Sequence, residues 1–210
     1  MDKIVVIGSS SMIAAQFTKV FSDQMSILTF GRTLKQDSFF DLEKFESFKN
    51  VLQVCDHRTT VLFFSAISSP EYAEKNVNYT MKINYEATCD LISSLLRNKT
   101  RVIFLSSDGI YGANSSICSE SEAPRPFGVY AFTKFLVEQR FKGHILFKST
   151  RLSYVLSTDD SFSKYIFDAV DDQLKIEAYG SLQRNIVCIN DVLDGLKKLC
   201  ENFDIVNSQY

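Results

Sequence analysis

A series of short apolar segments, separated by stretches long enough for helices, constrains the fold of this chain more than any other feature. Several segments, such as Lys3–Ile7 and residues 59–66, carry apolar or β-branched residues at nearly every position. Strands of this kind are buried on both faces, as the central strands of parallel sheets are. We therefore expect an α/β fold with a doubly wound parallel sheet. The expected strands are residues 3–7, 26–30, 40–42, 59–66, 101–105 and 144–155.

The length and the composition of the chain argue against several classes of protein. A chain of 210 residues suits one domain with a full hydrophobic core. A net charge of −2 and a pI near 5.7 provide no basic footprint for nucleic acid. The sequence has no apolar run near the roughly 18 residues of a membrane span. It enters its first strand without a signal peptide, so we expect a cytoplasmic protein.

The cysteines and histidines do not predict a metal site. Five cysteines are scattered along the sequence without a C-x-x-C pair, and His57 and His144 are the only histidines. Neither histidine lies at a spacing typical of metal ligands. We interpret the cysteines as reduced thiols of a cytoplasmic protein. They are Cys55, Cys89, Cys118, Cys188 and Cys200.

The first expected strand leads directly into a turn of small residues and then a helix. Gly8 permits a sharp turn, while Ser11 and Ala14 are small enough for close approach of the backbone to a ligand. Amides at the start of that helix would face a phosphate. For the turn at Gly8, a plain strand–helix turn is the open alternative.

The second strand ends at Gly31-Arg32, where an acidic residue would favour NAD and a guanidinium suits a 2′-phosphate. For Arg32, the open alternative is a solvated loop arginine.

Tyr130 and Lys134 are one helical turn apart, so their side chains can face one site. An unperturbed tyrosine titrates near about pH 10, and a lysine one turn away is expected to lower that pKa. Ser107, which follows the strand at 101–105, could hydrogen-bond the oxygen that gains or loses the proton. These side chains suit hydride transfer on or off a carbon that bears a hydroxyl or a carbonyl. A chance Tyr-x-x-x-Lys pair on a surface helix is the alternative.

Several motifs occur in an order and spacing that are far more specific than any one of them. They are residues 5–14 (VVIGSSSMIA), Asp41-Leu42, residues 63–66 (FFSA), Asn84, residues 106–112 (SSDGIYG), Tyr130-x-x-x-Lys134 and residues 179–192 (YGSLQRNIVCINDV). In this order they resemble the extended short-chain dehydrogenase/reductases, in particular the NAD-dependent epimerase/dehydratase family, which acts largely on nucleotide sugars. The resemblance spans nearly the whole chain and implies a Rossmann fold.

The resemblance also implies a role for each matching residue. Tyr130 would be the acid/base, Lys134 its pKa partner and a ligand of the nicotinamide ribose, and Ser107 the hydroxyl that orients the substrate oxygen. The cofactor would contact Gly8, Ser11, Met12, Ile13, Arg32, Asp41, Leu42, Ser65, Ala66, Tyr130 and Lys134. The substrate would contact Ser107, Asp108 and Arg184, although Arg184 could also be a surface arginine. Asn84 has two open interpretations, a functional residue and a buried amide that satisfies a neighbouring strand.

The chain departs from the family pattern in three places. Glycines expected at Ser11 and Ala14 are missing, which predicts weaker phosphate binding. Gly109 stands where the family's dehydratases carry a carboxylate, which disfavours elimination of water. The chain ends at Tyr210, which is short for this family. We therefore expect an NAD(P)-binding Rossmann domain of residues 1–155 and a reduced substrate-binding lobe of residues 156–210.

The leading hypothesis is an NAD(P)-dependent oxidoreductase that reduces a keto group of a nucleotide-linked sugar, with NADP expected and NAD as the alternative. A nucleotide-sugar 4-epimerase with bound NAD and a non-catalytic dinucleotide-binding module stay open. The expected partners are the nucleotide sugar and a second copy of the chain, without nucleic acid or membrane. The helices of Asn84 and Tyr130 would form the dimer, where Phe132, Phe135 and Leu136 offer apolar surface or else face the sheet.

Overall fold

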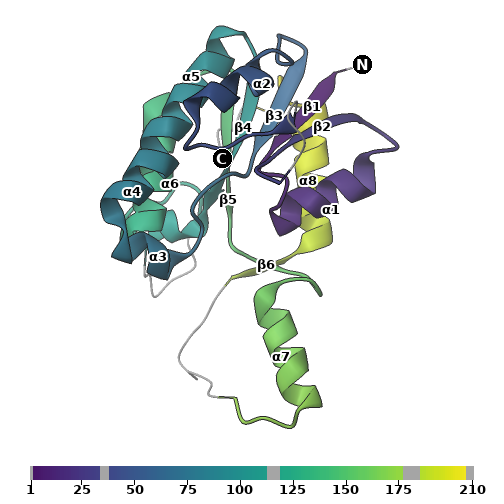
Figure 1. Cartoon of the computed structure of the whole chain (residues 1–210), viewed down its shortest axis with the longest axis vertical. Coiled ribbons are helices and arrows are strands. Elements are labelled where there is room, and N and C mark those ends of the chain that lie inside the picture. The colour runs from purple at the N-terminus through teal and green to yellow at the C-terminus, as the bar shows by residue number, and fades with distance from the viewer. Residues whose placement is uncertain (1, 34–37, 113–118, 177–184, 207–210) are drawn as a thin grey trace.

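The central feature of the computed structural model is a five-stranded parallel sheet with the strand order β2-β1-β3-β4-β5 (Figure 1). The structure describes residues 2–33, 38–112, 119–176 and 185–206. Helices cover both faces of the sheet, so the expected doubly wound α/β fold is confirmed. The strands of the sheet are β1 (Lys3–Ile7), β2 (Ser26–Phe30), β3 (Thr59–Phe63), β4 (Arg101–Ser107) and β5 (Phe147–Leu152).

Helical segments connect these strands, and local sequence signals start several of them. Ser69 caps α3 by accepting a hydrogen bond from the Tyr72 amide at 3.3 Å, and Pro70 follows at the first helical position. Asp160 caps α7 in the same way, with the amides of Phe162 and Ser163 as donors. The helices are α1 (Met12–Phe21), η2 (Phe45–Ser47), α2 (Phe48–Leu52), α3 (Pro70–Lys75), α4 (Val77–Met81), the π-helical η3 (Lys82–Ala87), α5 (Thr88–Arg97), η4 (Asp108–Tyr111), α6 (Gly128–Phe141), α7 (Ser161–Asp171) and α8 (Ile189–Glu201).

The apolar runs in the sequence arise because each central strand supplies two hydrophobic cores. In β1, Val5 and Ile7 belong to one core, whereas Ile4 and Val6 belong to the other. Neighbouring residues of a strand point to opposite faces, so both must be apolar when both faces are covered. Fully burying such a side chain contributes about 1.5–3 kcal/mol.

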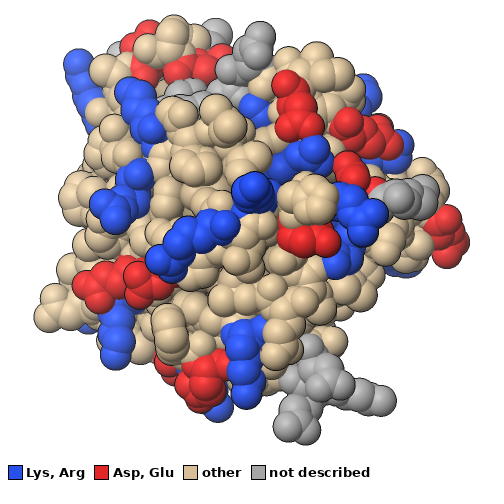
Figure 2. Space-filling model, turned by 90° about the horizontal axis from the view of Figure 1, so that it is seen from above, with Lys and Arg blue, Asp and Glu red and all other residues tan. Residues whose placement is uncertain are grey.

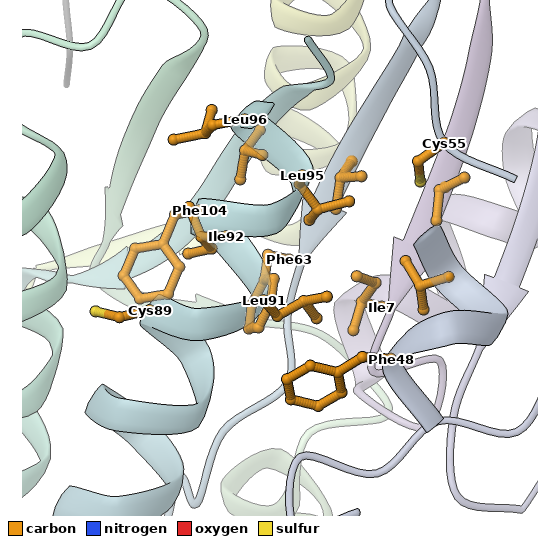
Figure 3. Close-up of a cluster of buried hydrophobic side chains, with 14 of the residues drawn as sticks. Ile7, Phe48, Cys55, Phe63, Cys89, Leu91, Ile92, Leu95, Leu96 and Phe104 are labelled. Carbon is orange, nitrogen blue, oxygen red and sulfur yellow. The ribbon is translucent and has the colours of Figure 1, made fainter. Parts of the chain in front are cut away.

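Helices α2, α5 and α6 cover the first core, and α1 and α8 cover the second. Figure 3 shows the first core, in which Leu91 and Leu95 of α5 lie against the sheet beside Phe63.

The sheet ends earlier than the sequence predicted, and the chain then changes direction. The strand expected at 144–155 is two strands, because β6 (Tyr154–Leu156) leaves the main sheet and pairs with β7 (Ile186–Cys188). Residues 144–146 form a turn, in which the His144 Nδ1 accepts a hydrogen bond from the Leu146 amide at 3.2 Å. The strand expected at 40–42 is also wrong, since Phe39 forms only an isolated bridge with Gly31. Phe40 and Leu42 are buried in the first core instead.

The chain returns to the sheet after the region expected to bind substrate. Helix α8 falls within the expected lobe of residues 156–210, but its apolar stripe packs into the second core. This stripe follows the 3–4 residue spacing of an amphipathic helix and consists of Ile189, Val192, Leu193, Leu196 and Cys200. The expected boundary at residue 155 stays a prediction, and the packing of α8 is the observation that bears on it. Helix α7 and the β6–β7 pair are the described parts that lie apart from the main sheet (Figure 1).

The surface carries charges of both signs. Figure 2 shows a band of Lys and Arg side chains across one face, with Asp and Glu side chains close beside it.

No helix in the described part of the chain is long and apolar enough to cross a membrane. Within the same residues, no group of three or more His, Cys, Asp or Glu side chains could hold a metal ion.

Candidate active site

One cavity of about 710 Å³ lies at the carboxyl ends of the central strands. Its size is within the roughly 300–1,000 Å³ of ordinary small-molecule sites. The cavity is lined by all the residues that were expected to contact a cofactor, together with Ser107. These lining residues are Gly8, Ser11, Met12, Ile13, Arg32, Asp41, Leu42, Ser65, Ala66, Tyr130 and Lys134. Asp108 lies beside the lining, and Arg184 falls outside the described residues.

The turn between β1 and α1 has the geometry of a phosphate-binding turn. Gly8 has φ +89°, and a Cβ atom there would lie 2.7 Å from the Ser65 amide nitrogen, so only glycine fits. Ser11 begins α1 with an extended backbone and makes no side-chain capping bond to any described residue. The first amides of α1 therefore face the cavity without a side-chain acceptor, which fits an anionic phosphate. Ala14 is fully buried, so its small side chain serves helix–sheet packing.

The end of β2 forms the part of the cavity beside this turn. A Cβ atom on Gly31 would lie 2.4 Å from the Ser9 Oγ, so a larger residue here would force the Ser9 side chain to turn away. Arg32 lines the cavity here, but so does Glu43. Asp41 holds the turn between them, because its Oδ1 accepts a hydrogen bond from the Glu43 amide at 3.1 Å. This end of the cavity thus presents one basic and two acidic side chains.

The three expected catalytic side chains come from two elements that meet at the cavity. Ser107 is the last residue of β4, and its Oγ accepts a hydrogen bond from the Gly109 amide at 3.1 Å, which starts η4. The same hydroxyl donates to the Asp108 Oδ1 at 3.4 Å. Tyr130 and Lys134 lie in the first two turns of α6. The structure therefore brings Ser107, Tyr130 and Lys134 to one cavity.

Burial controls the protonation of Lys134. Its Nζ donates a hydrogen bond to the Leu105 carbonyl at 2.6 Å and lies 4.4 Å from the centre of the Phe104 ring. Burial lowers the pKa of Lys134 from 10.5 to about 7, although the Glu138 carboxylate opposes the change.

Tyr130 does not behave as the sequence suggested. The Lys134 Nζ lies 5.8 Å from the centre of the Tyr130 ring, at the outer limit of a cation–π contact. Burial and then the Asp108 charge raise the pKa of Tyr130 from 10.0 to about 12. The net shift is therefore opposite to the one expected from Lys134, because burial and the Asp108 charge both disfavour the phenolate. Tyr130 is a protonated phenol at neutral pH.

Asn84 is held by backbone groups rather than directed at the cavity. Its Oδ1 accepts a hydrogen bond from the Ile67 amide at 2.8 Å, and its Nδ2 donates to the Ile67 carbonyl at 3.0 Å. Of the two open interpretations, these contacts favour the buried amide that satisfies a neighbouring strand. Asn84 thereby fixes the segment that follows β3, where Ser65 and Ala66 line the cavity.

Sequence reasoning missed several residues of the site. Ser106 lines the cavity, and its buried Oγ has no hydrogen-bond partner among the described residues. Ser68, Ser69 and Ser153 were also missed, and they follow strand ends, which is the signal that could have found them. Tyr79 of α4 and Val155 of β6 line the cavity too, without such a signal.

A comparison with protein families identifies the family of the chain. A model of the NAD dependent epimerase/dehydratase family matches residues 4–208. The chain belongs to this family. An ADP-L-glycero-D-manno-heptose-6-epimerase from Pseudomonas aeruginosa (strain UCBPP-PA14) is 35% identical over 69 residues. That match covers 33% of this chain and only 21% of the epimerase, so the chain aligns with about one fifth of that relative's length.

Solved structures share the fold at low sequence identity. A dTDP-4-dehydrorhamnose reductase from Bacillus anthracis str. Ames, in complex with NADP, superposes with a TM-score of 0.83 at 18% identity. The alignment covers 96% of this chain and 71% of the reductase. MoeE5 in complex with UDP-glucose and NAD gives a TM-score of 0.78 at 19% identity and covers 93% of this chain and 70% of MoeE5.

Proposed function

We propose that this protein is an NAD(P)-dependent oxidoreductase that reduces a keto group on a nucleotide-linked sugar. The observation that carries the proposal is the single cavity, which joins the Gly8 turn to Ser107, Tyr130 and Lys134. When bound, a nicotinamide cofactor supplies the hydride for such a reduction. The α1 amides would hold its phosphates, and the segment at Ser65 would border it.

Each catalytic side chain has a task that matches its position. Tyr130 would donate its phenolic proton to the carbonyl oxygen while the carbonyl carbon gains the hydride. Ser107 would hydrogen-bond the same oxygen and hold it in place. The Lys134 ammonium would stabilise the phenolate that Tyr130 becomes.

Tyr130 in its protonated form can donate a proton, which is what a reduction requires of it. Oxidation of a sugar alcohol needs a base, and a tyrosine with a pKa of about 12 is almost wholly protonated at neutral pH. An epimerase must begin with that oxidation, so it would need Lys134 and the bound cofactor to lower this pKa considerably. A dehydratase needs a further acid and base, and Gly109 has no side chain to supply one.

The test is a coupled measurement of cofactor and sugar. The purified protein, NADPH and dTDP-4-dehydrorhamnose, the sugar named in the reductase neighbour, should give one NADPH oxidised per keto group lost. The same assay with NADH reports the cofactor preference. UDP-glucose with NAD is the parallel reaction for the epimerase. Interconversion of UDP-sugars without net cofactor use would overturn the proposal and favour the epimerase.

A protein that binds cofactor but turns over neither sugar would favour the non-catalytic module. Cofactor binding is measured separately by thermal shift, because a ligand that binds the folded state raises its melting temperature.

A further inference from the structure

A buried ion pair lies directly behind Lys134 and does not touch the cavity. Arg151 of β5 donates to the Glu138 carboxylate at 2.6, 3.1 and 3.2 Å. The Arg151 and Glu138 side chains are only 4% and 1% exposed. Glu138 lies one helical turn after Lys134 on α6, so the two side chains share a face of the helix.

The same arginine joins a third element of the site. The Arg151 Nη1 donates to the Tyr111 hydroxyl at 2.7 Å, and its guanidinium carbon lies 4.9 Å from the centre of the Tyr111 ring. Tyr111 ends η4, the helical turn that starts at Ser107. Arg151 is also in register with Ser106 of β4. One guanidinium thus connects the elements that carry Ser107 and Lys134.

A buried ion pair is weak evidence for stability, because desolvation of both charges offsets their attraction. The position of the Arg151–Glu138 pair next to Lys134 suggests a different role for it. Glu138 is the charged group with the largest effect on Lys134, and it favours the ammonium form. A carboxylate without another partner would pair directly with a lysine one turn away. Arg151 holds Glu138 with three contacts, while the Lys134 Nζ remains directed at the Leu105 carbonyl.

We propose that Glu138 and Arg151 are positioning residues that keep Lys134 charged and directed at the cavity. Glu138 supplies the negative charge that retains the ammonium, and Arg151 prevents that carboxylate from drawing the ammonium away from the Leu105 carbonyl at the cavity. The role of Lys134 in catalysis rests on the proposed function, but the electrostatic control of Lys134 does not. Other titratable side chains near this part of α6 include Tyr130 on α6 itself, Asp108 and Tyr111 of η4, Tyr79 of α4 and Glu74 of α3.

The test follows the protonation of Lys134 directly. The Lys134 signal in protein labelled with ¹³C-lysine is assigned by its loss in Lys134→Arg and followed from pH 5 to 11. Glu138→Gln should lower the titration midpoint by about one pH unit or more, because the attraction is lost and the Arg151 charge is unopposed. Arg151→Gln should raise the midpoint, because the Glu138 charge is then unopposed. The double variant Glu138→Gln/Arg151→Gln should return close to the unmodified protein.

Three control variants separate charge from structure. Tyr111→Phe removes a hydrogen bond of Arg151 without changing charge and should leave the midpoint in place. Glu201→Gln removes a carboxylate that pairs with Lys197 one turn away on α8, and should also leave it unchanged. Arg151→Lys keeps the charge, so its midpoint should stay while its melting temperature falls. If Arg151→Gln does not fold, Glu138→Gln carries the test alone, with a lowered midpoint as the supporting result and an unchanged or raised one as the overturning result.

Opposite shifts in the two charge variants would support the inference. Shifts of the same sign, no shift, or an equal shift in Tyr111→Phe would overturn it and leave the ion pair a structural link. The proposed function is tested by a different measurement, the turnover of the sugar and NADPH. A protein without turnover can still show the opposite shifts, and an active reductase can lack them.

Discussion

At the scale of single residues, the cavity holds a phenol that is protonated and a lysine that is easily deprotonated. Replacing Tyr130 by Phe removes only the hydroxyl that would donate the proton. We expect Tyr130→Phe to bind NADPH as the unmodified protein does and to lose turnover by about 10²–10⁴-fold. Tyr165→Phe is the matched control, because Tyr165 is exposed on α7 outside the cavity. Near-normal turnover in Tyr130→Phe would end the proposed mechanism.

Lys134 predicts a dependence of stability on pH. In the folded protein it releases its proton near pH 7, whereas in the unfolded chain it keeps the proton to its ordinary pKa of 10.5. Between these values the unfolded chain binds more protons, so the free energy of unfolding should rise with pH. Below about pH 7 both states are protonated, and the full penalty for burying the ammonium remains.

Lys134→Met removes that penalty together with the hydrogen bond to Leu105. The variant should therefore gain stability relative to the unmodified protein at pH 6, and the difference should shrink by pH 10. Each unit of pKa shift corresponds to about 1.4 kcal/mol, so a change on the order of a few kcal/mol is expected. Urea unfolding at both pH values measures it. A difference that is constant with pH would contradict the depressed pKa of Lys134.

Arg32 predicts the cofactor preference, since it lines the cavity at the end of β2. A guanidinium would form charge-assisted hydrogen bonds with a 2′-phosphate. We expect NADPH to bind more tightly than NADH, and Arg32→Ala to reduce the gap by about tenfold, which corresponds to about 1.4 kcal/mol. Thermal shift with both cofactors measures this, and Arg58→Ala is the control because Arg58 lies outside the lining. Equal affinities in the unmodified protein would contradict this role of Arg32.

At the scale of elements, the helix that carries Tyr130 is fixed at its first turn by another helix. The Glu74 Oε1 of α3 accepts a hydrogen bond from the Val129 amide at 2.6 Å. A carboxylate at a helix N-terminus satisfies a free amide and complements the helix dipole. Gly128, with φ +82°, allows the carboxylate to approach, because a Cβ atom there would lie 2.8 Å from it.

Glu74→Gln should therefore destabilise the protein by about 0.3–1 kcal/mol at low salt, with a smaller effect at high salt. Glu71→Gln is the matched control on the same helix. It removes only an exposed ion pair with Lys75 and should have almost no effect. Equal losses in the two variants would show that α3, rather than the contact with α6, is responsible.

These element contacts mark the limit of what the sequence could predict. The continuous apolar runs predicted the parallel strands, because a strand that is buried on both faces has apolar residues at nearly every position. The break at Ser153 and the turn at 144–146 were missed, since the residues around them have ordinary strand propensity. The motif positions predicted the cavity lining, because carboxyl ends of parallel strands meet at one edge. The Glu74 contact and the Arg151–Glu138 pair depend on tertiary packing between distant segments, which a single sequence does not specify.

At the scale of the whole molecule, the last described helix closes the second core. Leu196 of α8 is 3% exposed and packs in the core that also contains Ile4 and Phe17. The chain therefore leaves the sheet after β5 and returns to it. The region between contains β6, α7 and β7, and Val155 and Val187 of the β6–β7 pair still pack against the second core. The dimer expected through α6 stays a prediction. Phe132 is an exposed aromatic residue on that helix, as such an interface would need.

If α8 belongs to the sheet domain, a cavity in it should weaken the whole domain. Leu196→Ala should lower the free energy of unfolding by about 2–5 kcal/mol, because it removes buried contacts and leaves a void. Val170→Ala is the matched control in α7, where Val170 is 66% exposed, and should change stability by less than about 0.5 kcal/mol. Denaturant unfolding, followed by circular dichroism and tyrosine fluorescence, should show one transition in both variants. A separate early transition in Leu196→Ala, with the sheet intact, would instead make α8 part of an independent lobe, because only a detachable helix can lose its packing without unfolding β1.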